Sequence, residues 1–323
     1  MTMTPEQAAW FQGTFTRLVD NVDRAVLGKR EVVGLVLSAM LAEGHVLLED
    51  APGTGKTSLA KALAATVQGT SSRIQFTPDL LPSDVTGVTI YDQASHRFEF
   101  HKGPVFASIV LADEINRASP KTQSALLEVM EESRVTVDGV THEAGRPFLV
   151  IATQNPIEQA GTYKLPEAQL DRFLVRTSIG YPDLAASERI LAGAADRNPA
   201  ASLPAIITTG AVADMADLAA TVHTESAVLR YTAQLAEATR TDAATRLGVS
   251  VRGALSMIRI AKVWAAAQGR HYVTPDDVKE LAAPVWTHRL VLDPEAEFAG
   301  TTADTVIARV LEDVAAPQAR SAA

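Results

Sequence analysis

The sequence predicts an α/β domain built on a parallel sheet, followed by a smaller helical domain. Before about Tyr181-Pro182-Asp183, short apolar runs bounded by turn residues alternate with helical patterns. A glycine-rich loop separates the first run from the next helical pattern, as in a strand–loop–helix unit. Beyond this point the patterns are helical, and strand-like segments are expected to stop. This order favours a parallel sheet with crossover helices.

The apolar runs are expected to form the sheet, and helices are expected before, between and after them. In chain order the runs are His45–Glu49, Arg73–Phe76, Ser108–Ala112, Pro147–Ala152 and Val175–Ile179. The later helical stretches lie at about 184–195, 208–220, 225–240, 251–268 and 275–283. We therefore expect an N-terminal helix over 1–23, an α/β domain over 24–183, a helical domain over 184–313 and a flexible tail over 314–323.

Two β-hairpins are predicted as insertions in the α/β domain. Val88–Tyr91 and Arg97–Phe100 alternate polar and apolar residues. Arg134–Val137 and Val140–Glu143 flank Asp138-Gly139, a strong signal for a type I′ turn with positive φ at both central residues. The preceding helix is expected to begin at Ser119-Pro120, an N-cap followed by proline, and to place Leu126, Leu127 and Met130 on one packed face.

Composition excludes several classes of protein. The chain has 323 residues, 47% of them apolar, and 29 Lys+Arg against 38 Asp+Glu give a net charge of −9. A negative field does not recruit nucleic acid by net charge. The absence of cysteine excludes disulfides, thiolate zinc sites and iron–sulfur clusters. No signal peptide and no long uncharged apolar stretch is present, so we expect a soluble, cytoplasmic chain without membrane insertion.

The glycine-rich loop predicts a phosphate site. Gly53, Thr54, Gly55, Lys56 and Thr57 follow an apolar run, and Ser58 opens a helical pattern. Small residues let backbone N–H groups surround an anion, the helix N-terminus adds positive potential, Lys56 reaches the outer phosphates and the Thr57 hydroxyl reaches Mg²⁺. The strict G-x-x-x-x-G-K-[ST] pattern fails at its first position, Asp50. Because Asp tolerates unusual backbone angles better than most residues, the loop is still expected to form.

Paired carboxylates end another apolar run. Asp113 and Glu114 follow Ile109–Ala112, and the carboxyl ends of strands are where α/β sheets place ligands. Asp113 is expected to hold Mg²⁺ through its water shell, and Glu114 to orient and deprotonate the attacking water. Such a pair also occurs as a simple helix cap, but the upstream phosphate loop favours the catalytic role. No guanine-reading Asn-Lys-x-Asp occurs, so ATP is the expected nucleotide.

Two further polar residues next to apolar runs are candidates for the same nucleotide site. Asn155 comes after the run ending at Ala152 and can hydrogen-bond a terminal phosphate and the attacking water, although an Asx turn is the ordinary role of such a residue. Arg172 precedes the last run and would serve a neighbouring subunit as an arginine finger if it lies at the far edge of its domain. The alternative is a surface ion pair with little energetic weight.

Four segments together resemble the MoxR family of AAA+ ATPases over about Leu27 to Val278. They are Pro-Gly-Thr-Gly-Lys-Thr, Ala-Asp-Glu-Ile-Asn-Arg-Ala, Ala-Thr-Gln-Asn-Pro-Ile-Glu and Leu-Pro-Glu-Ala-Gln-Leu-Asp-Arg-Phe. The resemblance implies a P-loop NTPase fold: a parallel five-stranded sheet with two inserted hairpins and a C-terminal helical lid. In family terms, residues 53–57 resemble Walker A, Asp113-Glu114 Walker B, Asn155 sensor 1 and Arg172 the arginine finger.

The resemblance extends to further residues and to partners. Arg252 resembles sensor 2, with Val251 where the family often has proline, which should loosen the helix start. Leu27-Gly28-Lys29 resembles the segment that packs on adenine, and Arg117 is a candidate intersubunit contact or a solvated charge. The hairpins resemble elements that line a central pore. The family implies a homo-oligomeric ring, a hexamer, that hydrolyses ATP with Mg²⁺ and matures, assembles or inserts metal into client proteins, often with a von Willebrand factor A domain partner.

Two alternatives use the same motifs. An AAA+ motor acting on nucleic acid would want a basic pore or an added DNA-binding domain, and neither is evident in this acidic chain. A nucleotide-binding switch or scaffold with little turnover would not need Glu114, Asn155 and Arg172, all of which are present. The sequence therefore favours a hydrolysing chaperone-type ATPase.

Overall fold

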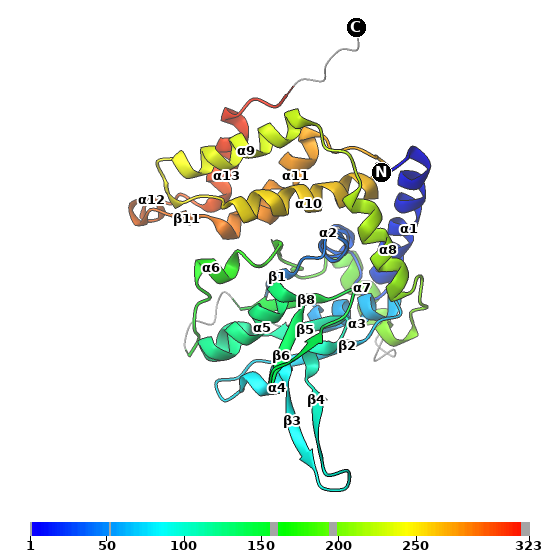
Figure 1. Ribbon diagram of the computed structural model, residues 1–323. Coiled ribbons are helices and arrows are strands. Elements are labelled where there is room, and N and C mark those ends of the chain that lie inside the picture. The colour runs from blue at the N-terminus through cyan, green and yellow to red at the C-terminus, as the bar shows by residue number, and fades with distance from the viewer. Residues whose placement is uncertain (1, 52, 156–160, 194–198, 318–323) are drawn as a thin grey trace. The chain divides into compact units, whose positions relative to one another are not determined.

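The fold comes from a computed structural model that describes residues 2–51, 53–155, 161–193 and 199–317 (Figure 1). The described residues form two compact units. The first, here called the sheet unit, lies within Arg17–Phe173 and Thr177–Asp214. The second, the helical unit, lies within Met1–Thr16, Leu174–Arg176 and Met215–Ala323. Among the described helices, none has both the length and the apolar character needed to cross a lipid bilayer.

The largest described sheet has five strands in the order β2-β5-β8-β1-β9. Its strands are β1 Val46–Glu49, β2 Ser71–Gln75, β5 Ile109–Asp113, β8 Leu149–Gln154 and β9 Val175–Thr177. The β1–β8, β5–β8 and β2–β5 pairs are parallel. The predicted parallel sheet is confirmed, and the five expected apolar runs are its strands with small shifts of their ends.

The core of the sheet unit forms where helices cover the apolar strands. Every residue of β5 is buried, which is why its sequence is almost continuously apolar. Helix α5, Pro120–Glu132, begins where it was predicted: the Ser119 side chain caps it by accepting from the Thr122 backbone N–H. Its expected apolar face is buried in the same cluster as residues of β1, β5 and β8, with members Leu47, Val110, Leu126, Leu127, Met130, Val150 and Phe173.

The remaining helices of the chain before residue 221 are α1 to α4 and α6 to α8. They are α1 Pro5–Asp23, α2 Arg30–Leu41, α3 Lys56–Thr66, α4 Pro82–Thr86, α6 Glu167–Leu170, α7 Leu184–Ala192 and α8 Thr209–Ala220. Helices α1 and α8 each contribute residues to both units. Residues 194 and 195 of the helix expected over 184–195, and residues 318–323 of the expected tail, lie outside the described residues.

Both predicted hairpins are present. Strands β3, Gly87–Asp92, and β4, Arg97–Lys102, form one, which extends away from the sheet in Figure 1. Strands β6, Arg134–Val137, and β7, Val140–Glu143, form the other. Its turn has φ of 50° at Asp138 and 79° at Gly139, as a type I′ turn requires.

A ring cluster joins the two hairpins at their bases. The ring of Phe100 in β4 stacks on that of His142 in β7, with centroids 4.2 Å apart. Phe106 meets both rings edge-on, and the Lys102 ammonium lies 5.0 Å from the Phe106 centroid. The two insertions therefore share one packed base although the two stacked rings lie 42 positions apart in the chain.

The helical unit contains a small sheet that the sequence analysis did not anticipate. Its helices are α9 Ser226–Thr241, α10 Val251–Ala267, α11 Pro275–Trp286, α12 Pro294–Phe298 and α13 Ala303–Asp313. Strands β10, Thr245–Leu247, and β11, Val291–Leu292, pair in antiparallel fashion. The expectation that strands stop near residue 181 was therefore wrong. Segments this short are too brief to show a two-residue hydrophobic period.

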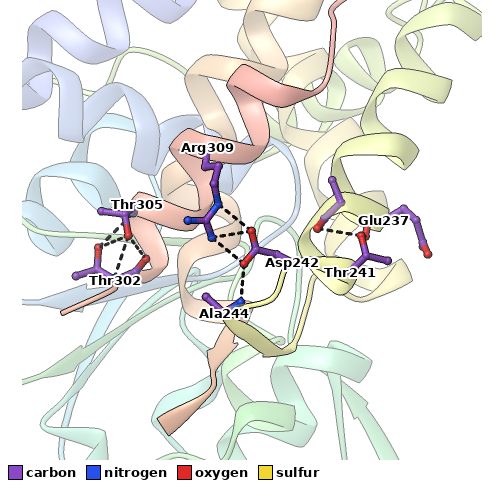
Figure 2. Close-up of polar contacts among 8 residues, drawn as sticks. Glu237, Thr241, Asp242, Ala244, Thr302, Thr305 and Arg309 are labelled. Atoms are coloured by element: carbon purple, nitrogen blue, oxygen red, sulfur yellow. Dashed lines mark hydrogen bonds and ion pairs between the residues drawn. The ribbon is translucent and has the colours of Figure 1, made fainter. Parts of the chain in front are cut away.

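An ion pair fastens α13 to the turn after α9 (Figure 2). The Arg309 guanidinium donates to both carboxylate oxygens of Asp242, with its closest contacts at 2.7 Å. The same carboxylate accepts from the Ala244 backbone N–H at 2.8 Å. Asp242 thus ties the last helix of the unit to the segment that leads into β10.

Candidate active site

Polar residues gather at the carboxyl ends of the sheet strands because the register aligns those ends. In the β2–β5 pair, Gln75 lies opposite Asp113. In the β1–β8 pair, Glu49 lies opposite Gln154, so the residues after each strand start from the same edge. Ligands in open α/β sheets bind at this edge.

A cavity of about 420 Å³ lies at this edge and brings together most of the predicted site residues. The predicted ones among its lining residues are Gly53, Gly55, Lys56, Thr57, Ser58, Asp113, Glu114 and Asn155. Asp50, Arg73, Gln75 and Thr153 line it too. Thr54 does not belong to the lining residues; its hydroxyl lies 3.4 Å from the Ala51 carbonyl oxygen, to which it donates.

The phosphate loop adopts the backbone form that its glycines permit. Gly53 and Gly55 have φ of 85° and 93°, a region that other residues rarely occupy. Gly55 is also the N-cap of α3, so the helix N-terminus opens onto the cavity. The Lys56 ammonium lies 3.4 and 3.3 Å from the carbonyl oxygens of Asp50 and Ala51. The cation therefore rests against the loop that it is expected to serve.

Asp50 has a different role from the one expected. An unusual backbone angle was expected at the first motif position, but Asp50 is not among the residues with positive φ. Its side chain is only 3% exposed and accepts hydrogen bonds from Ser178, Ile179 and Gly180. At this position the carboxylate makes the contacts, and the backbone adopts no left-handed angle.

Asp113 is held by two side chains from neighbouring strands. Its Oδ2 lies 2.6 Å from Nη2 of Arg73 in β2, and its Oδ1 accepts from the Thr153 hydroxyl in β8 at 2.6 Å. Asp113 is 8% exposed, so these partners offset the cost of burying its charge. Asp113 is nevertheless one of the residues that line the cavity, as is Thr57.

Glu114 sits in a strained backbone conformation at the cavity. Its φ of 57° and ψ of 49° are left-handed, which is uncommon for a residue with a long side chain. Its backbone N–H donates to Thr153 Oγ1 at 2.9 Å. Its carboxylate Oε2 accepts from Gln75 Nε2 at 2.8 Å and lies 3.1 Å from Arg117 Nε. Arg117, a candidate for contact with another subunit, thus pairs with Glu114 of its own chain.

The other predicted residues are not among the described residues that line the cavity. Arg172 pairs with Glu131 of α5 at 2.9 Å, and neither residue is among the described lining residues. Lys29 donates to the Tyr181 carbonyl oxygen at 2.7 Å, and a Cβ on Gly28 would lie 3.2 Å from that of Ala186. Arg252 belongs to the helical unit, on the first turn of α10, whose N-cap Ser250 accepts from the Gly253 N–H at 2.9 Å.

The donor set of the cavity fits a polyphosphate with a divalent cation. An N-terminal helical turn, a glycine loop and a lysine provide N–H donors and positive charge. Thr57 and Asp113 provide the oxygen ligands that Mg²⁺ prefers. Glu114 and Asn155 add a base and an amide in the same cavity.

Sequence reasoning missed Arg73, Gln75 and Thr153. The roles of all three depend on strand pairing. Strands β2 and β8 flank β5, and these residues of β2 and β8 contact Asp113 and Glu114. The available signals were Thr153, two positions before Asn155, and the polar residues Arg73 and Gln75 within the second apolar run. The sequence did not reveal the order of the strands in the sheet. Without that order, these residues could not be assigned to Asp113 and Glu114.

A parallel sheet with a phosphate loop and a separate helical unit defines a P-loop NTPase of the AAA type. A family model described as "ATPase family associated with various cellular activities (AAA)" matches residues 45–175, and an AAA lid domain model matches residues 237–310. The crystal structure of a candidate ATPase from Cytophaga hutchinsonii is similar, with a TM-score of 0.90 and 36% identity over 97% of this chain and 98% of that one.

Two curated relatives are similar along most of the chain. The Bacillus subtilis protein YeaC is 45% identical over 95% of this chain and 96% of its own length. The Mycobacterium tuberculosis protein named Chaperone MoxR1 is 42% identical over 94% of this chain and 83% of its own length. The chain belongs to the MoxR family of AAA+ ATPases, and it hydrolyses ATP.

Proposed function

We propose that the protein is a chaperone-type ATPase of the MoxR family whose cavity at the sheet edge binds ATP with Mg²⁺ and hydrolyses it. One observation carries the proposal: the phosphate loop, two acidic residues and Asn155 line a single cavity. The ATPase domain would span 24–183 and the lid 184–313.

The predicted site residues have roles that their chemistry supports. The loop N–H groups and Lys56 would bind the phosphates, with Thr57 and Asp113 holding Mg²⁺, which neutralises phosphate charge during transfer. Gly53, Thr54, Gly55 and Ser58 would shape the loop. Glu114 would orient the attacking water and accept its proton once its carboxylate leaves Gln75 and Arg117, and Asn155 would hydrogen-bond the terminal phosphate.

The site would be completed by a second copy of the chain. Arg172 pairs with Glu131 and does not line the cavity of its own chain within the described residues. An arginine finger that does not line the cavity of its own chain would serve the nucleotide of a neighbour, which supports a ring, and the family resemblance suggests a hexamer. Arg252 would reach the terminal phosphate from the lid.

The β3–β4 hairpin supports the chaperone part of the proposal. Val88, Ile90, Tyr91 and Phe98 are exposed on it, and the Phe98 side chain is 75% exposed. Apolar patches on a surface mark sites that bind other proteins. The relative from M. tuberculosis is named a chaperone, so client proteins are the proposed targets. The family resemblance adds metal-dependent clients and a von Willebrand factor A domain partner to this proposal.

Replacing Lys56 tests this function. Lys56→Ala should abolish measurable ATP binding in calorimetry because it removes the charge that meets the outer phosphates. Lys61→Ala is the matched control: it removes a lysine from the exposed side of the same helix, α3, and should bind ATP as the unaltered protein does. ATP affinity that is unchanged in Lys56→Ala would refute the site.

A further inference from the structure

The Asp50 carboxylate is buried and receives its hydrogen bonds from one short segment. Its Oδ1 accepts from the Ser178 hydroxyl and the Gly180 N–H, both at 2.8 Å, and its Oδ2 accepts from the Ile179 N–H at 2.7 Å. All three donors follow β9 directly in the chain. Both carboxylate oxygens are therefore used to hold the backbone that leaves this strand.

The backbone of Asp50 contacts two other parts of the site. Its N–H donates to the Gln154 carbonyl oxygen at 3.2 Å, next to Asn155. Its carbonyl oxygen accepts from the Lys56 ammonium at 3.4 Å. Asp50 thus joins the end of β8, the phosphate loop and the segment after β9 at a single residue.

These contacts matter because the strict phosphate-loop pattern has glycine here. A glycine would supply no acceptor for the three donors, which would leave two buried or part-buried backbone N–H groups without this partner. Hydrogen bonds to an ionised carboxylate are stronger than neutral ones, so they can hold the start of the loop in place. Where the strict pattern has a flexible glycine, Asp50 instead hydrogen-bonds the start of the loop to residues 178–180.

We propose that Asp50 is a positioning residue for nucleotide binding: its carboxylate fastens the phosphate loop to residues 178–180 and so preorganises Lys56 and the loop N–H groups. This inference rests on the proposed phosphate site. A preorganised loop does not need to be ordered when the nucleotide binds, so affinity is gained. Glu114 and Asn155 do not depend on the Asp50 side chain, so the chemical step should be little affected.

A graded set of variants tests the role. Asp50→Gly restores the strict motif yet should weaken ATP binding at least about tenfold, because charge-assisted hydrogen bonds are lost. Asp50→Asn keeps the size with one acceptor oxygen and should fall between Asp50→Gly and the unaltered protein. Ser178→Ala removes only the hydroxyl donor and should weaken binding by a smaller factor. Asp183→Asn, at the α7 N-cap, is the matched carboxylate control and should bind ATP normally.

The measurements are the dissociation constant for ATP by calorimetry, KM and kcat, and hydrogen exchange of the loop amides without nucleotide. We expect a raised dissociation constant and KM, a kcat at saturating ATP within about threefold of the unaltered value, and faster loop exchange. ATP binding by Asp50→Gly as tight as that of the unaltered protein would overturn the proposal. If Asp50→Gly does not fold, unchanged affinity in folded Asp50→Asn and Ser178→Ala would overturn it equally.

The Lys56→Ala variant separates this inference from the proposed function. Loss of binding in Lys56→Ala together with normal binding in the Asp50 variants would refute the positioning role alone. Normal binding in Lys56→Ala would refute the phosphate site itself. A drop in thermal stability of the Asp50 variants with no change in ATP affinity would assign Asp50 a purely structural role and would also overturn the proposal.

Discussion

At the residue scale, the proposed catalytic carboxylate of Glu114 is bound to neighbouring side chains of its own chain. Its left-handed backbone is fixed by the hydrogen bond from its N–H to Thr153, and its carboxylate is engaged by Gln75 and Arg117. Strain of this kind persists when surrounding contacts over-determine the conformation. The arrangement places the carboxylate at the cavity wall, where the attacking water would have to displace the two donors, Gln75 and Arg117.

Glu114→Gln is expected to separate binding from hydrolysis. The amide keeps the size of the side chain but cannot accept a proton, so hydrolysis should fall by about 100-fold or more while ATP affinity stays nearly constant. Hydrolysis is measured by phosphate release and affinity by calorimetry. Glu128→Gln, which alters an exposed carboxylate of α5, should leave both values unchanged. Hydrolysis retained by Glu114→Gln would remove Glu114 from its catalytic role.

Which residues could be predicted depends on whether their partners are local in the chain. The loop glycines, Lys56 and Thr57 were predicted because strand, loop and helix follow one another. Gln75 acts on a residue 39 positions away, so its role needs the strand order. Asp50 receives its bonds from residues about 130 positions away, and its sequence context suggested a backbone effect instead.

At the scale of elements, short-range signals were reliable and short strands were not. The Asp138-Gly139 turn and the Ser119 cap form as predicted because each depends on a few adjacent residues. The β10–β11 pair depends on segments that are brought together from distant parts of the helical unit. Their length gives too little hydrophobic pattern for prediction, and tertiary packing decides that they pair.

The Asp242–Arg309 contact should stabilise the helical unit measurably. Asp242→Asn keeps the shape of the side chain but removes its charge, so the free energy of unfolding should fall by about 1–2 kcal/mol. Urea unfolding followed by tryptophan fluorescence reports on this unit, because Trp10, Trp264 and Trp286 all lie in it.

A matched control uses an ion pair within α9, the helix that ends just before Asp242. Glu237 pairs with Arg240 on the exposed side of α9, so Glu237→Gln should change the free energy of unfolding by less than about 0.5 kcal/mol. Equal effects of Asp242→Asn and Glu237→Gln would show that the contact in Figure 2 is an ordinary surface pair.

At the scale of the whole molecule, the proposed arginine finger does not line the cavity of its own chain within the described residues. The phosphate loop and the acidic residues line the cavity, whereas Arg172 is engaged by Glu131 elsewhere in the same unit. If another copy supplies Arg172, hydrolysis depends on assembly. The isolated chain would then bind ATP but turn it over slowly, because an arginine finger contributes about 10³–10⁵ in rate.

The most direct measurement is ATP hydrolysis per subunit as a function of protein concentration, with sedimentation under the same nucleotide conditions. We expect the specific activity to rise as ring-sized species appear, and Arg172→Ala rings of the same size to stay nearly inactive while still binding ATP. A specific activity that is independent of concentration and unaffected by Arg172→Ala would contradict a site shared between subunits.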